Sequence, residues 1–212
     1  MNLTEQEWLI SEDARPMWAH VDRQISNRKR RLLAIAFCRA LWDHFNLRQR
    51  RLLLQAEAFA EDDIKLSDFL DIHNEAKCMY RWVAHSSEEE TDEFLLAKHV
   101  HYACHVVHEY TTNTVLEPIP KRLLAGSVRP NLIRDLVGNP FRKNIVQPHW
   151  KTTSVLHLAN AIFNDRSFDI MPILADALEE AGCDNTEILN HCREFPNHER
   201  GCWLVDAVLN KS

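Results

Sequence analysis

The residues with the clearest capacity for chemistry lie near the end of the chain, where thiol and imidazole side chains gather. Thiolate and imidazole are the ligands of structural zinc sites, and such a site would hold a small terminal region together. One pair is tightly spaced, because three residues separate His198 from Cys202, but the sequence has no Cys-x-x-Cys. The sequence therefore predicts a metal site, for zinc or iron, with four candidate ligands: Cys183, His191, His198 and Cys202.

The same residues also fit an apolar core. Cys183 precedes a predicted helix cap, and Cys202 stands beside Trp203 in an apolar segment. A free cysteine is commonly a small buried hydrophobic residue. Both interpretations stay open from the residues alone.

A second group of potential ligands follows the pattern His-x-x-Cys-His-x-x-His. His101, His105 and His108 share one face of a predicted helix. The apolar stripe of that helix centres about 170° from His101 and His105, so we expect the imidazoles to face solvent or a partner. One helix face supplies few convergent ligands, which makes this the weaker metal candidate.

A basic stretch opens another predicted helix and provides a candidate anion site: Arg28, Lys29, Arg30 and Arg31. Cations at the start of a helix oppose its dipole, so they need acidic partners, water or a bound anion. Nucleic-acid binding follows as a third hypothesis. The net charge of −6 and the lack of a helix-turn-helix pattern argue against it, and acidic residues such as Glu61 could neutralise the arginines instead.

Catalytic motifs are wanting in the sequence. There is no Gly-x-Ser-x-Gly, phosphate loop, Gly-x-Gly-x-x-Gly or His-Glu-x-x-His. We therefore expect a non-catalytic interaction or regulatory module with another protein as partner. A metal-binding protein, structural or hydrolytic, is the alternative.

Bulk properties set the context for these sites. The chain has 212 residues, of which 45% are hydrophobic and 26% charged, as is ordinary for a globular protein. We find no secretory signal and no apolar run of the roughly 20 residues that span a bilayer, and we expect a cytoplasmic protein without membrane association.

Helical patterns dominate and predict an all-α, multi-helix bundle with a smaller helical C-terminal part packed against it. A capping box of Thr4 and Glu7 opens the first helix, and Asp184 with Glu187 suggests a later one. Prolines and a glycine mark a connector over residues 116–130. It separates an N-terminal bundle (1–115) from a C-terminal subdomain (131–212). The predicted helices include residues 28–47, 47–60, 68–85, a helix ending near 112, 130–137, 153–164, 171–181 and 200–209.

Several segments resemble an uncharacterised paralogous family of planctomycete bacteria. These are TEQEWL from Thr4, RKRRLLAIAFCR from Arg28, GNPFR from Gly138, LADALEEAGCDN from Leu174 and HERGCWLVD from His198. The resemblance frames most of the chain but implies kinship only, because the family has no assigned activity, substrate or cofactor.

Overall fold

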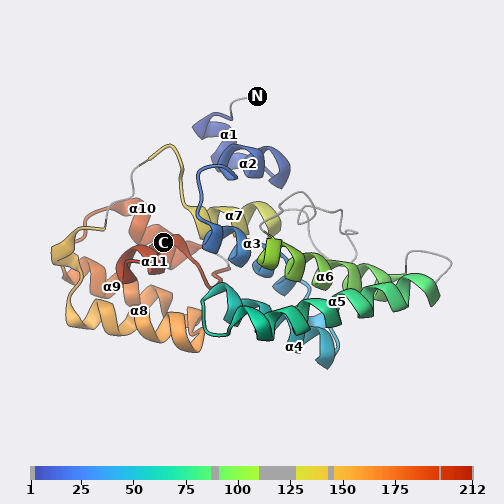
Figure 1. Ribbon diagram of the computed structural model, residues 1–212. Helices are drawn as coiled ribbons and strands as arrows, with labels where there is room; N and C mark the ends of the chain where they lie inside the picture. Colours follow the sequence, from blue (N-terminus) through green and yellow to red (C-terminus); the bar gives the residue numbers. More distant parts are fainter. Residues whose placement is uncertain (1–2, 87–90, 110–127, 143–145, 196, 212) are drawn as a thin grey trace. The chain divides into compact units, whose positions relative to one another are not determined.

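The computed structural model describes residues 3–86, 91–109, 128–142, 146–195 and 197–211. This part of the chain contains eleven α-helices and no strand, so the predicted all-α fold is confirmed (Figure 1). None of its helices is long and apolar enough to cross a membrane.

The chain forms two compact units. One, the N-terminal unit, comprises Glu12–Pro130; the other, the C-terminal unit, comprises Asn131–Ser212 together with the residues through Ser11. The second unit differs from the predicted subdomain by including the first helix, which precedes the N-terminal unit in the sequence. Of the predicted connector, residues 116–127 lie outside the described part, and the last three form the first turn of a helix.

In the N-terminal unit, α6 packs against three other helices, α3, α4 and α5. Every residue of the third helix from Arg31 to Cys38 is buried, so no face of this segment is left to solvent. The helices and the 3-10 turn of this unit are α2 (Ala14–Val21), α3 (Asn27–Arg39), η1 (Trp42–His44), α4 (Leu47–Ala60), α5 (Leu66–Ser86) and α6 (Asp92–Glu109).

The predicted helix over residues 28–47 is wrong in its length. Ser26 caps α3, and the helix ends at Arg39. Asn46 is extended (φ −72°, ψ 168°) and forms a capping box with Gln49 that starts α4. Helical backbone cannot continue through an extended N-cap residue, so the second predicted helix, 47–60, begins where it was expected.

In the C-terminal unit, α8 packs against α9 and α11, and α9 packs against α10. The capping box of Thr4 and Glu7 is confirmed at α1, whereas Asn185 rather than Asp184 caps α10. Arg134 fixes α1 by donating hydrogen bonds to the carbonyl of Trp8 at 2.8 Å and 3.0 Å. The elements are α1 (Glu5–Ile10), α7 (Val128–Val137, in this unit from Asn131), η2 (Pro148–Trp150), α8 (Thr153–Asp165), η3 (Phe168–Ile170), α9 (Met171–Glu180), α10 (Thr186–Glu194) and α11 (Trp203–Leu209).

Candidate metal centre

Four potential ligands converge inside the C-terminal unit. Asp135 lies in α7, His191 in α10, His198 in the segment after α10, and Cys202 immediately before α11. One donor atom from each lies within 4.8 Å of the other three, and no other such group occurs in the described residues. Residues that are 67 positions apart at the extremes are thus brought to one point by the packing of this unit.

Two of the separations between donor atoms are close to those of ligands around one ion. His191 Nε2 lies 3.2 Å from Cys202 Sγ and 3.4 Å from Asp135 Oδ1. Donor atoms that share a tetrahedral zinc ion, with bonds of about 2.0–2.3 Å, lie about 3.3–3.8 Å apart. The contact between His198 Nδ1 and Asp135 Oδ1 is shorter, at 2.7 Å, and is the hydrogen bond that an ion would replace.

The group is closed to solvent. The side chains of Asp135, His198 and His191 are 0%, 5% and 7% exposed, and Cys202 is fully buried. Aromatic rings of Phe195 and Trp203 lie 5.0 Å and 5.1 Å from the His191 ring. This apolar surround fixes the orientation of the imidazole and excludes water.

The pKa of Asp135 is low in spite of its burial. Burial alone would raise its pKa, but hydrogen bonds and charge interactions with His191 and His198 lower the pKa to about 2. The backbone N–H of Glu199 donates to Asp135 Oδ2 at 2.8 Å. Because that bond orients the carboxylate and occupies Oδ2, the other oxygen is left to face the two imidazoles and the thiol.

Cys202 is not an activated nucleophile as it stands. Burial, followed by the charge of Asp135, raises the pKa of its thiol well above the ordinary value. The backbone N–H groups of Val205 and Leu204 oppose this by hydrogen bonding to the sulfur. A metal ion would deprotonate the thiol outright, and these donors would then support the thiolate.

The geometry also differs from a cysteine–histidine–aspartate triad. In a triad the base contacts the nucleophile with one ring nitrogen and the carboxylate with the other. Here the same atom, His191 Nε2, faces both Cys202 Sγ and Asp135 Oδ1. Nε2 of His198, the ring nitrogen that does not contact Asp135, is buried without a hydrogen-bond partner in the described residues.

Three of the four predicted ligands belong to the group and one does not. Cys183 is buried in the apolar core of the unit, where it lies with Ile188 and Cys192. Asp135 takes its place, and sequence reasoning missed it. The available signal was an acidic residue between two apolar pairs, Leu132-Ile133 and Leu136-Val137.

The second predicted group lies in the N-terminal unit and includes one residue that the sequence did not indicate. His101, His105 and His108 are half-buried, and the ring of His73 from α5 stacks against all three. Burial, followed by the positive charge of His73, His105 and Lys77, lowers the pKa of His101 to about 4. The expected solvent-facing stripe is therefore covered in part by α5.

The basic stretch at the start of α3 has partners within the chain. Arg28 pairs with Glu61 at 2.8 Å, as the sequence allowed, and Arg30 pairs with Asp22 at 3.2 Å. The guanidinium of Arg31 lies over the Phe59 ring, 4.9 Å from its centroid. The backbone N–H of Lys29 donates a hydrogen bond to the side chain of the cap residue Ser26. Carboxylates thus neutralise two of the four cations, Arg28 and Arg30.

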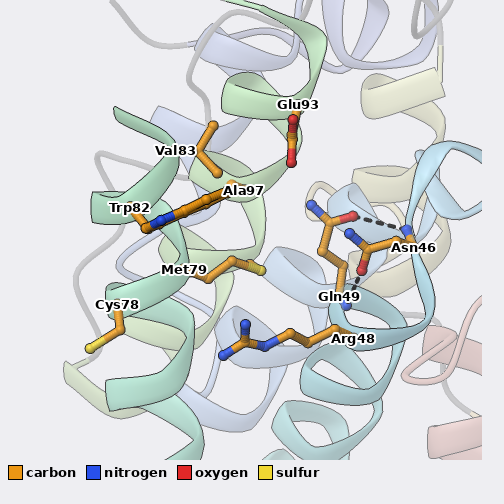
Figure 2. Close-up of a pocket in the computed structure, with 9 residues that line it drawn as sticks. All are labelled: Asn46, Arg48, Gln49, Cys78, Met79, Trp82, Val83, Glu93 and Ala97. Carbon is orange, nitrogen blue, oxygen red and sulfur yellow. Dashed lines mark hydrogen bonds between the residues drawn. The ribbon is translucent and has the colours of Figure 1, made fainter. Parts of the chain in front are cut away.

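Each of the two units also contains a pocket. A pocket of about 400 Å³ in the N-terminal unit is lined by Trp82 and Arg48, with Asn46 and Gln49 hydrogen bonded to each other (Figure 2). Arg48 is paired with Glu75 at 2.7 Å. A pocket of about 420 Å³ in the C-terminal unit reaches the metal candidate only through His191.

Comparison with family models, with curated proteins and with solved structures found no match for this chain.

Proposed function

We propose that this protein binds one zinc ion in its C-terminal unit and that the ion is structural. The ligands are Asp135, His191, His198 and Cys202. The observation that carries the proposal is the convergence of four donor atoms within 4.8 Å. An ion at this point would join α7 to α10 and to the start of α11. Because the unfolded chain has no preformed site, the free energy of binding would stabilise the folded unit.

The donor set favours zinc over iron. A thiolate, two imidazoles and a carboxylate give four donors of the kinds that zinc accepts in tetrahedral geometry. Iron sites built on two histidines and a carboxylate keep open positions for oxygen and substrate. Here Cys202 supplies a fourth donor, and the four side chains are at most 7% exposed.

The same closure favours a structural role over a hydrolytic one. A catalytic zinc ion keeps one position for water or substrate, whereas structural ions take four protein ligands. A zinc-stabilised helical unit fits the non-catalytic interaction or regulatory role expected from the sequence. The ion would fix a surface without taking part in a reaction.

Two buried cysteines provide a matched test of the ligand set. The full chain, purified without a histidine tag, is assayed for zinc that survives dialysis and for its melting temperature with and without chelator. We expect Cys202→Ala and Asp135→Asn to lose the ion and to melt at a lower temperature that chelator no longer changes. Cys183→Ala removes an equally buried thiol from the same core, so it should melt lower but keep the ion.

A purely structural cavity effect would give a different pattern. If Cys202→Ala kept its zinc, or if chelator left the melting temperature of the native chain unchanged, the proposed centre would be wrong. Loss of the ion on replacing Cys183 alone would instead restore the ligand set predicted from the sequence.

A further inference from the structure

A second cluster of ligand side chains lies in the N-terminal unit, outside the proposed zinc centre. We infer that His73, His101, His105 and His108 form a second metal site, which takes a divalent transition-metal ion of the zinc, nickel and copper group through imidazole nitrogens alone. Neither the zinc centre nor its ligands are needed for this site, since all four histidines belong to α5 and α6.

The spacing of the rings carries the inference. The centroid of the His73 ring lies 5.9 Å, 5.6 Å and 5.2 Å from those of His101, His105 and His108. The His101 and His105 centroids are 6.1 Å apart. With metal–nitrogen bonds of about 2.0–2.1 Å, imidazoles that share one ion have centroids about 5–6.5 Å apart. These four separations fall within that range, although the ring nitrogens do not yet converge as the donor atoms of the zinc centre do.

Turning the rings would convert the stack into a ligand shell. The His73 ring is within 28° of parallel to each of the other three. Rotation about the Cβ–Cγ bond redirects a ring nitrogen by up to about 2 Å while the helices stay in place, because this torsion has a broad energy profile. The site needs side-chain rotation only, on two helices that already pack together.

The position of His73 supplies what a single helix could not. His101, His105 and His108 lie at successive turns of α6, so alone they form a row. His73 faces that row from α5 and is 9% exposed, which places a ligand on the opposite side of the proposed ion. The buried Nδ1 atom of His101 has no hydrogen-bond partner in the described residues, although its ring is stacked on Tyr80 at 5.3 Å.

Charge near the cluster acts against a cation and offers a test. Lys77 interacts electrostatically with His101, and its positive charge would repel a bound metal ion. Neutral imidazoles nevertheless bind nickel, copper and zinc well. Lys77 is exposed, so it can be neutralised with little effect on packing. We expect Lys77→Gln to raise the affinity of this site by a few fold.

Cobalt(II) distinguishes this site from the zinc centre because only the zinc centre has a sulfur ligand, Cys202. The metal-free full chain is titrated with cobalt, and bound metal is counted by equilibrium dialysis. We expect two equivalents. The equivalent at the Cys202 site gives a thiolate-to-cobalt charge-transfer band, and the equivalent at the histidines gives only weak visible bands. The double variant His101→Ala and His105→Ala should lower the affinity of the second equivalent by about tenfold or more, since changing even an outer partner of a ligand costs that much.

His85→Ala is the matched control. It removes an exposed histidine from the end of α5, the helix that carries His73, and should change the binding of neither equivalent. If the double variant loses helix content, the single changes His105→Gln and Lys77→Gln decide, with opposite effects expected on affinity. The inference is overturned if binding stops at one equivalent and that equivalent gives the charge-transfer band. It is also overturned if a second equivalent binds with unchanged affinity after these histidines are replaced. One histidine-dependent equivalent without that band would uphold it and refute the zinc centre instead.

Discussion

Gly138 provides a quantitative test of the packing next to the zinc centre. It follows α7, three residues after Asp135, and has φ +75°, where side chains other than glycine are strained. A Cβ atom added there would lie 3.0 Å, 3.2 Å and 3.3 Å from three ring carbons of Trp203. The Trp203 ring is buried and in turn contacts His191, so it has little room to retreat.

Two costs follow from Gly138→Ala. Left-handed backbone costs a residue with a Cβ about 1–2 kcal/mol. Overpacking against a fixed ring adds about 1–3 kcal/mol. We therefore expect the free energy of unfolding to fall by about 2–5 kcal/mol, a large fraction of the stability of an ordinary domain.

Gly182→Ala separates the two costs. Gly182 also has positive φ, at +91°, but an added Cβ would meet no atom within 4 Å. Only the backbone cost applies, so the loss should be about 1–2 kcal/mol. Both residues belong to the C-terminal unit, and urea unfolding followed by circular dichroism and tryptophan fluorescence measures both losses. Equal losses for the two variants would refute the assignment of Trp203 as a rigid neighbour of Gly138.

Further predictions concern thiol reactivity and pH. Of the six cysteines only Cys78 is exposed, so an aromatic disulfide reagent should titrate one fast thiol in the native chain and none in Cys78→Ser. Buried thiols such as Cys38, whose pKa is raised by burial to about 12, should react only on unfolding; a second fast thiol would contradict the packing. Burial of Glu75 acts to raise its pKa, but hydrogen bonds from two arginines of α4 lower it below 4.5 overall. The ion pairs of Glu75 with Arg48 and Arg51 therefore stabilise the fold above about pH 4.5. The gain is a few tenths of a kcal/mol because these side chains are partly exposed, and it is lost as the pH falls through the lowered pKa. Glu75→Gln should cost this amount at pH 7 and nothing near pH 2, as measured by urea unfolding; an equal cost at both pH values would rule out an electrostatic origin.

Local sequence signals determined much of the secondary structure. Side-chain caps act over two or three residues, so the capping box of Thr4 and Glu7 could be recognised without knowledge of the fold. The residues from Leu32 to Cys38 are all apolar, which leaves no face of that helix for water, and all of them are buried. Where two cap residues compete within one turn, as Asp184 and Asn185 do, the choice depended on backbone geometry that the pattern does not specify.

The sequence by itself thus determined the helical class and three of the four residues of the candidate centre, since imidazole and thiol stand out by type wherever they occur. Only the tertiary structure decided that Asp135 joins them in place of Cys183, and that His73 meets the histidines of α6. The physical reason is that ligand type is a local property, whereas the convergence of atoms from different helices depends on how those helices pack. A carboxylate on α7 and an imidazole on α5 become recognisable only once the buried positions around them are known.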